Sequence, residues 1–127
     1  MAATSGKRQS VRVGERTIRV TNLDKVLYPE TGTTKRDVLD YYAAVAPVLL
    51  PHAARRPLTR KRWPDGVGTE DGPLKPFFRK DLEDSAPDWI PRVSIRHTEH
   101  TNVYPLADEP AVLTWLGQVA ALELHVP

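Results

Sequence analysis

The sequence lacks cysteine, and it also lacks any long run of hydrophobic residues. Without cysteine there can be no disulfide framework and no thiolate metal site. No apolar run approaches the ~20 residues that a membrane-spanning helix needs. The polar, basic stretch of residues 1–10 has no apolar region of the kind found in a secretory signal. These absences favour a cytoplasmic protein of bacterial type that has no contact with a membrane.

Motifs of catalysis and metal binding are scarce as well. The sequence has no Ser/His/Asp arrangement and no phosphate-cradling Gly-rich loop. The carboxylates of residues 81–84 (DLED) lie in an expected turn, so we interpret them as a surface cluster rather than a two-metal site. Glu123 and His125 share a face of an expected strand, but two ligands do not make a metal site. His97 and His100 flank an expected hairpin turn and should face solvent. We therefore expect no catalytic residue and no metal ligand.

Charge is divided unevenly along the chain. Residues 1–63 hold 13 Lys or Arg and 5 Asp or Glu, whereas residues 64–127 hold 5 and 11. Such asymmetry indicates a basic surface for an anionic partner, unless folding mixes the two halves into an even surface. The length of 127 residues suits one domain or part of a larger one, and a hydrophobic content of 40% is enough for a core.

Hydrophobic periodicity predicts an α+β fold with a small, mixed but mostly antiparallel sheet and two main helices. Residues 1–10 are interpreted as a disordered basic leader and residues 11–127 as the folded part. Hairpins are expected at 11–20 and 92–106, with further strands at 57–63, 77–79 and 122–126. The last strand has no evident neighbour, so we expect further protein or a partner chain to complete the sheet.

Both helices have recognisable starts. Thr34 and Asp37 form a variant of the capping box before the first helix. Its expected buried face consists of Val38, Tyr41, Tyr42, Val45 and Leu49. Pro47 should kink or split this helix. The second helix is expected to begin after Asp108 as N-cap and to carry apolar residues through position 120.

The strand expected at 57–63 is strongly basic. Alternation along a strand places Arg60 and Arg62 on one face and Lys61 on the other, so neither face suits a core. Arginine binds phosphate through two parallel hydrogen bonds, and lysine acts as a point charge. We interpret these residues as phosphate or nucleotide contacts. The alternative is a solvated edge strand whose charges prevent aggregation.

Two other groups of residues also suit an anionic or nucleic-acid partner. Phe77 and Phe78 lie among cations, and an exposed ring can stack on a base, although both rings can also belong to the core. Lys35 falls in the first turn of the first helix, where a cation opposes the helix dipole. An anion held by Lys25, Lys35 and the free N–H groups of that helix terminus would reverse this penalty. The alternative is a pair of ordinary surface lysines.

These groups occur in the order of a known pattern. The matching segments are 21–29 (TNLDKVLYP), 31–35 (TGTTK), 40–42 (DYY), 56–57 (RP), 59–64 (TRKRWP), 77–78 (FF), 85–87 (SAP) and 122–127 (LELHVP). In this order and spacing they resemble the polymerase (primase-like) domain of bacterial DNA ligase D, which serves non-homologous end joining with the Ku protein. The resemblance spans nearly everything from Val11 onward. It implies the N-terminal part of an archaeo-eukaryotic primase-like fold.

The resemblance implies a 5′-phosphate site. Lys25 and Lys35 match the lysines that hold the 5′-phosphate of a DNA end or gap, and Asn22 lies beside them. His125 matches a family position to which we assign no role.

The resemblance also implies contacts with the template and the nucleotide. Arg62 matches a basic residue on the template and primer side, and we group Arg60 with it. Phe77 and Phe78 match an aromatic pair that meets the template near the break. Lys61 matches a residue near the phosphates of the incoming nucleotide.

One departure from the family pattern limits the expected activity. In the family, a metal-binding Asp-x-Asp motif lies downstream of the His-Val-Pro stretch, and this sequence does not contain it. We therefore expect a DNA-end-binding part that does not polymerise alone and holds no cofactor. Mn²⁺ or Mg²⁺ is expected only in the complete polymerase domain.

Two alternatives stay open. The chain can be one half of a split primase-polymerase whose partner chain supplies the carboxylates, or a stand-alone module that binds nucleic acid. The expected partners are 5′-phosphorylated DNA ends and, through the parent system, Ku. The expected location is the bacterial nucleoid. The sequence leaves the oligomeric state open.

Overall fold

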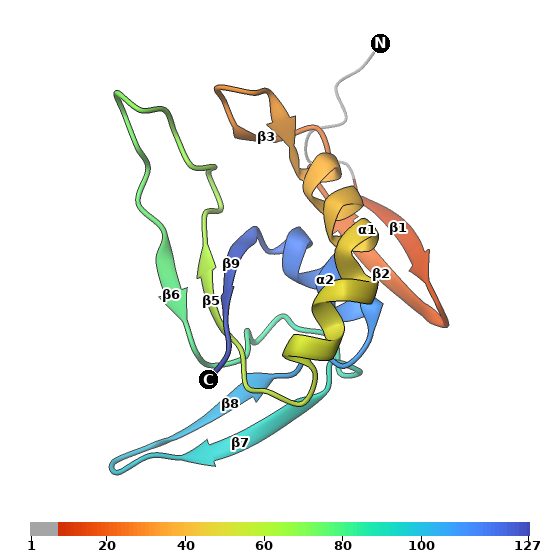
Figure 1. Ribbon diagram of the computed structural model, residues 1–127, viewed down its shortest axis with the longest axis vertical. Helices are drawn as coiled ribbons and strands as arrows, with labels where there is room; N and C mark the ends of the chain where they lie inside the picture. Colours follow the sequence, from red (N-terminus) through yellow and green to blue (C-terminus); the bar gives the residue numbers. More distant parts are fainter. Residues whose placement is uncertain (1–7) are drawn as a thin grey trace.

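The computed structural model describes residues 8–127 and has an α+β fold. Two helices lie at the centre, with short strands and hairpins around them (Figure 1). The helices are α1 (Lys35–Ala53) and α2 (Pro110–Gln118). The strands are β1 (Arg8–Val13), β2 (Arg16–Thr21), β3 (Val26–Tyr28), β4 (Thr33–Thr34), β5 (Thr59–Arg62), β6 (Phe77–Arg79), β7 (Arg92–Arg96), β8 (Thr101–Pro105) and β9 (Ala121–His125). The expected fold class is confirmed.

All strand pairs between these elements are antiparallel. β1 pairs with β2, β3 with β4, and β7 with β8, while β5 lies between β6 and β9 in a three-stranded sheet. The hairpins expected at 11–20 and 92–106 are therefore present. The final strand was expected to lack a neighbour, but β9 pairs with β5 along its length. Because β5 is the central strand, the edge-strand alternative for residues 57–63 was wrong.

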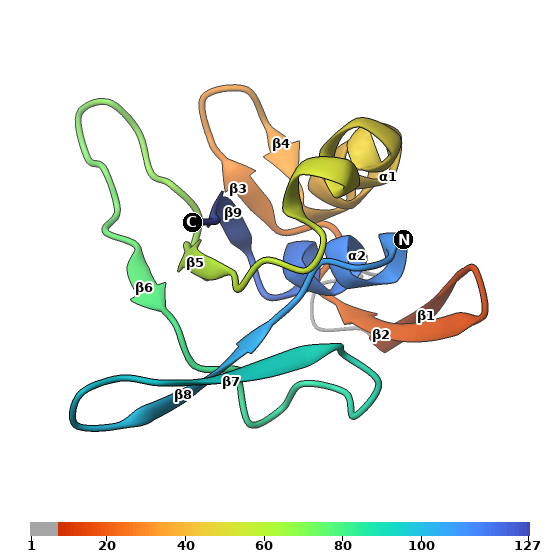
Figure 2. The same cartoon turned by 60° about the horizontal axis from the view of Figure 1, so that its bottom comes forward.

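Helix α2 is the centre of the hydrophobic core. All of its residues from Ala111 to Gly117 are buried, as expected for a helix that is apolar around its whole circumference. It packs against α1, and β2 and β9 also contact it (Figure 2). Gly117 allows the close approach of α1, since a Cβ atom there would lie 2.8 Å from Leu39 Cδ1. Through α2, the core therefore connects β2, near the start of the described chain, with β9 at its end.

The start of α1 follows the expected capping box. The Asp37 N–H donates to Thr34 Oγ1 at 3.3 Å, and the Thr34 N–H donates to Asp37 Oδ2 at 2.9 Å. The helix is not split at Pro47, because this residue is exposed and water can solvate the carbonyl that loses its N–H partner. Tyr41, expected in the core, is 63% exposed. Val38 and Tyr42 are buried as expected, and Leu39 and Ala46 complete the buried face of the helix.

Two boundaries differ from the expected ones. The N-cap of α2 is Glu109, because the side chain of Asp108 instead accepts the backbone N–H of Arg55 at 2.7 Å. The expected leader, residues 1–10, lies partly outside the described residues. Its last three residues are not disordered, since they pair with β2 as the start of β1. In the described part of the chain, neither helix has the length and hydropathy of a membrane span.

Candidate nucleic-acid interface

Lys25 and Lys35 come together where the segment after β2 crosses the start of α1. The Lys35 N–H donates to the Lys25 carbonyl at 2.8 Å, and the Arg36 N–H donates to the Leu23 carbonyl at 3.0 Å. The Lys25 N–H in turn donates to the Asn22 carbonyl at 2.9 Å. Asn22 has a φ of 56°, in the left-handed region that asparagine tolerates better than most residues. The structure therefore places Asn22 and Lys25 on one loop and joins that loop by backbone hydrogen bonds to the first turn of α1, which carries Lys35.

The first turn of α1 does not offer the free N–H groups that we expected for an anion. The N–H groups of Lys35 and Arg36 bond to backbone carbonyls, and that of Asp37 bonds to the Thr34 hydroxyl. This expectation was wrong because the preceding loop folds back onto the helix. Any anion here must be held by side chains, with the helix dipole as a secondary contribution.

Lys35 is a buried cation without an anionic partner. Its exposure is 6%, and no carboxylate within residues 8–127 forms an ion pair with it. Burial, together with the nearby charges of Lys25 and Arg62, lowers the pKa of Lys35 to about 8. Its side-chain hydrogen bond goes to Gln118 Oε1 at 3.5 Å. A bound anion would compensate the cost of burying this charge.

Lys25 is more accessible and pairs with an acidic side chain. Its Nζ lies 3.5 Å from Asp65 Oδ1, and the Asp65 side chain is almost fully exposed. The turn carrying Asp65 lies against β3, because the Val67 N–H donates to the Leu27 carbonyl at 2.7 Å. Gly66 is needed there, since its φ is +89° and a Cβ atom would lie 2.8 Å from the Leu27 oxygen. An ion pair this exposed is weak, so a phosphate can replace Asp65 as the partner of Lys25.

Arg60 is not on the surface, so the expectation that it contacts DNA was wrong. Its exposure is 0%, and its guanidinium forms an ion pair with Glu83 at 2.5 Å. The same group donates to the carbonyls of Leu58, Lys80 and Asp81 at 3.0, 3.1 and 2.7 Å. Glu83 is buried as well, so it does not belong to an exposed acidic cluster. The loop after β6 therefore supplies the carboxylate and two of the carbonyls that make burial of Arg60 possible.

Arg62 links this buried pair to the lysine site. Its Nε donates to the Val119 carbonyl at 2.7 Å, and its Nη1 lies 3.3 Å from Glu83 Oε2. The guanidinium also lies 5.1 Å from the ring centroid of Phe77. Because Arg62 is half-buried and close enough to lower the pKa of Lys35, it contributes to the same positive field.

Phe77 and Phe78 are both exposed. Their exposures are 43% and 61%, so the alternative that both belong to the core was wrong. In the register of β5 and β6, Phe77 lies opposite Arg62 and Phe78 opposite Lys61. Lys61 Nζ lies 5.2 Å from the Phe78 ring centroid and 3.6 Å from Glu123 Oε2. An edge strand thus presents two aromatic rings supported by cations, an arrangement suited to stacking on bases.

The histidines do not form a metal site. His125 Nε2 lies 2.6 Å from Glu123 Oε2, and His97 Nε2 lies 3.0 Å from the Tyr104 hydroxyl. His97 is therefore half-buried rather than directed into solvent, whereas His100 is exposed. In the part of the chain that the structure describes, no three His, Cys, Asp or Glu side chains gather in a way that could hold an ion.

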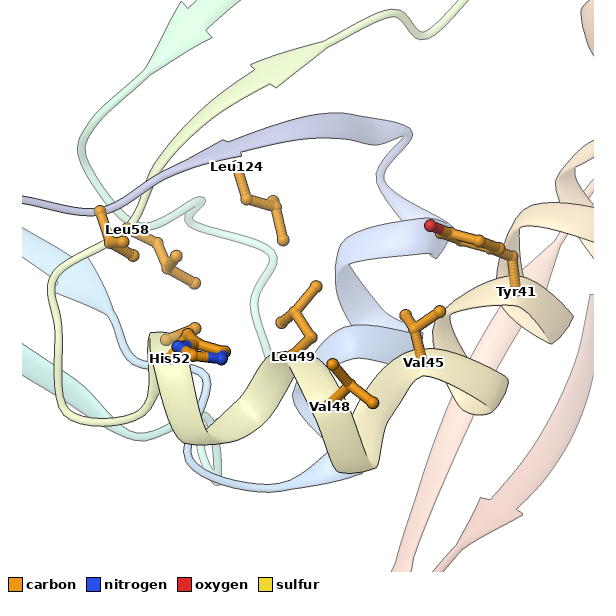
Figure 3. Close-up of a pocket in the computed structure, with 9 residues that line it drawn as sticks. Tyr41, Val45, Val48, Leu49, His52, Leu58 and Leu124 are labelled. Atoms are coloured by element: carbon orange, nitrogen blue, oxygen red, sulfur yellow. The ribbon is translucent and has the colours of Figure 1, made fainter.

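A hydrophobic groove lies between α1 and β9. Its volume is about 470 Å³, and Figure 3 shows side chains of α1 directed toward Leu124. The lining residues are Tyr41, Val45, Val48, Leu49, His52, Ala53, Leu58, Leu124 and Val126. None of the expected nucleic-acid contacts lines this groove, so it is separate from the basic surface.

Comparison with known proteins shows the family of the chain. The sequence model of the LigD primase-polymerase domain matches residues 34–127. The chain belongs to the LigD primase-polymerase domain family. This confirms the resemblance found in the sequence, and the match covers β5, β6, α2 and β9 as well as α1.

Mycobacterial LigD proteins are among the similar sequences. The chain is 54% identical over 113 residues to the multifunctional non-homologous end joining DNA repair protein LigD of Mycobacterium tuberculosis. It is 53% identical over 110 residues to the multifunctional non-homologous end joining protein LigD of Mycolicibacterium smegmatis. These matches cover 89% and 87% of this chain, but the chain spans only 14% of the length of either relative.

A solved LigD structure has the same fold. The polymerase domain of Mycobacterium tuberculosis ligase D, determined in complex with DNA, superposes with a TM-score of 0.79 at 55% sequence identity. The match covers 87% of this chain and 37% of that chain.

Two residues of the candidate site were missed by sequence reasoning. Glu83 was taken for a surface carboxylate, and Gln118 carried no signal because a single glutamine at a helix end is ordinary. Both matter only through partners far away in the sequence, Arg60 for Glu83 and Lys35 for Gln118.

We expect Glu83→Gln to destabilise the protein by about 3 kcal/mol, because it removes the counter-charge of the buried Arg60. The free energy of unfolding in urea measures the effect. The control is Asp84→Asn, which removes an exposed carboxylate next in the sequence and should change stability by less than about 0.5 kcal/mol. Equal effects of the two substitutions would contradict the assigned role of Glu83.

We expect Lys35→Met to stabilise the protein at pH 7 by on the order of 1–3 kcal/mol, because it removes a buried charge. Burial lowers the pKa of Lys35 from 10.5 to about 8. Between these two values the unfolded chain binds more protons than the folded one, so stability should rise with pH.

Urea unfolding at a series of pH values measures this rise, which Lys35→Met should reduce. The exposed Lys75→Met is the matched control and should retain it. An unchanged pH dependence in Lys35→Met would show that Lys35 is not the titrating group.

Proposed function

We propose that this chain binds the 5′-phosphate of a DNA end or gap, as the N-terminal portion of a LigD-type primase-polymerase domain in non-homologous end joining. The observation that carries the proposal is the buried, positively charged Lys35, which has no carboxylate partner in the described residues and lies near Lys25 and Arg62. A terminal phosphate carries a charge of about −2 and can interact with two lysines at once.

Lys25 and Lys35 differ in what they contribute. Lys25 is half-exposed and has a weak ion pair with Asp65, so it can meet an incoming phosphate first. Lys35 is buried, where the local dielectric constant is low and a charge–charge attraction is stronger. Asn22 is on the same loop, and its carbonyl fixes the backbone of Lys25. The proposed site therefore selects a terminal phosphate by its charge.

The rest of the DNA is proposed to lie along β5 and β6. Phe77 and Phe78 offer ring surfaces to the template, and Arg62 supplies positive charge beside them. Lys61 is proposed to lie near the phosphates of an incoming nucleotide, although Glu123 is its partner in this structure. The relative of known structure was solved with DNA, which supports a DNA partner for the shared fold.

The repair setting follows from the relatives. The mycobacterial relatives are named as non-homologous end joining proteins. We therefore also propose that the protein acts together with Ku and that it is located at the bacterial nucleoid. The described residues offer no cluster of metal ligands, so no residue is assigned here to the Mn²⁺ or Mg²⁺ of a complete polymerase domain.

We expect the protein to bind a recessed duplex with a 5′-phosphate about tenfold more tightly than the same duplex with a 5′-hydroxyl, from charge-assisted hydrogen bonds. Lys25→Ala combined with Lys35→Ala should bring this ratio close to one. General salt-sensitive affinity should change much less, because the remaining cations still contact the DNA backbone. Fluorescence anisotropy at fixed ionic strength measures both affinities.

The matched control is Lys75→Ala combined with Lys80→Ala, which removes the same charge from exposed positions. It should lower both affinities and leave the ratio unchanged. Equal binding of the phosphate and hydroxyl ends by the unmutated protein would refute the proposed 5′-phosphate site.

A separate prediction concerns the aromatic pair. Phe77→Ala and Phe78→Ala should each weaken binding to a duplex with a single-stranded template overhang by about 1–3 kcal/mol, the usual contribution of base stacking. The phosphate-to-hydroxyl ratio should not change, because neither ring belongs to the lysine site. Tyr41→Ala removes an exposed ring from α1 and should have no effect. The proposed template contact is wrong if loss of the Phe rings has no more effect than loss of Tyr41.

A further inference from the structure

Gln118, the last residue of α2, joins two parts of the proposed phosphate site. Its Oε1 accepts the backbone N–H of Thr21 at 2.9 Å, and its Nε2 donates to Thr21 Oγ1 at 2.8 Å. The same Oε1 is the side-chain partner of Lys35 Nζ at 3.5 Å. Thr21 immediately precedes Asn22, so one side chain connects the segment bearing Asn22 with the ammonium group of Lys35.

The orientation of this amide is determined by Thr21. A backbone N–H can only donate, so the amide oxygen, not the nitrogen, must face it. The nitrogen then faces the Thr21 hydroxyl, which can accept its hydrogen. As a result the oxygen also faces Lys35, to which it offers a partial negative charge but no full charge.

The charged groups that act on Lys35 are cationic. Lys25 and Arg62 both act against the protonated form of Lys35. Arg62 is held by the carbonyl of Val119, the residue after Gln118, and by the carboxylate of Glu83. Each of the three cations thus has a partner, but only that of Lys35 is neutral: Arg62 has Glu83 and Lys25 has Asp65.

We propose that Gln118 is a specificity-determining residue, whose neutral amide positions Lys35 and leaves its charge uncompensated for a 5′-phosphate. This inference rests on the proposed function. A carboxylate in the same place would be a permanent counter-ion of Lys35. It would compete with the phosphate for Lys35, and it would repel the negative charge of the phosphate.

The decisive variant is Gln118→Glu, because it changes charge with little change in shape. One carboxylate oxygen can still accept the Thr21 N–H, and the other can accept from the Thr21 hydroxyl, which can rotate. We expect the ratio of affinities for 5′-phosphate and 5′-hydroxyl recessed duplexes to fall about tenfold or more in this variant. The affinity for the hydroxyl duplex should fall much less.

Gln118→Met distinguishes an effect of added charge from an effect of lost hydrogen bonds. Methionine has a similar length but cannot form the bonds to Thr21 or Lys35, so a purely structural role would make Met more harmful than Glu. If neutrality is what matters, the affinity ratio should fall further in Gln118→Glu than in Gln118→Met. Asn102→Asp on β8 is the matched charge control, at the opposite end of the molecule from β3 (Figure 1), and should leave the ratio unchanged.

The titration of Lys35 provides a readout that does not depend on DNA. NMR of the labelled lysine side chains should place the Lys35 pKa near 8 in the unmutated protein. A carboxylate at position 118 favours the charged amine, so the pKa should rise in Gln118→Glu. Gln118→Met should not raise it.

The outcomes distinguish the two proposals. If the unmutated protein does not prefer the 5′-phosphate duplex, the proposed function is refuted. If it does, but folded Gln118→Glu keeps the same preference or the same Lys35 pKa, the role of Gln118 is refuted and the phosphate site stands. A greater loss of preference in Gln118→Met than in Gln118→Glu also refutes it.

Discussion

Burial of a positive charge is costly unless a partner compensates it, and within residues 8–127 two cations are buried, Arg60 and Lys35. Arg60 has its partner inside the protein, in the carboxylate of Glu83 and three backbone carbonyls. Lys35 has only the amide of Gln118. The two cations are therefore suited to different roles, because the charge of Arg60 is compensated within the fold whereas that of Lys35 favours an external anion.

The surrounding helices and strands hold Arg60 and Lys35 in different environments. Helix α2 is buried on all sides, and its C-terminal end presents Gln118 and the Val119 carbonyl to Lys35 and Arg62. The three-stranded sheet holds Arg60 in its central strand and the two Phe rings at its edge. Glu83 binds both arginines, so the loop after β6 connects the core of the sheet with the proposed DNA surface. The basic surface is therefore built on elements that are themselves part of the core.

The chain matches part of a larger solved domain in the LigD family. The chain spans 37% of the solved polymerase domain that it resembles, and the fold of this part is retained with a TM-score of 0.79. The Lys25–Lys35 arrangement depends on the loop after β2, on α1, on Gln118 of α2, and on Arg62 and Asp65 at and after the end of β5. The proposed phosphate site is thus assembled from segments that are far apart in the sequence.

Local features followed from the sequence because they depend on neighbouring residues. The hairpins, the capping box of α1 and the strand of residues 77–79 each arise from patterns a few residues long. The predicted start of α2 was wrong because the side chain of Asp108 accepts the N–H of Arg55, a residue distant in the sequence, and does not cap the helix. The side of α1 that became buried also depended on α2, so Tyr41 was misplaced.

The sequence by itself determined both helices, most of the strands and the family, and it supplied the candidate residues Lys25, Lys35, Phe77 and Phe78, but it did not predict strands β3 and β4. Only the tertiary structure decided which cations have partners. Alternation could not show that Arg60 is buried, because its partner Glu83 is 23 residues away. Nor could it identify Gln118, which is 83 residues from Lys35. Burial and charge compensation are properties of the packed chain, and they distinguish a structural arginine from a lysine that can bind a ligand.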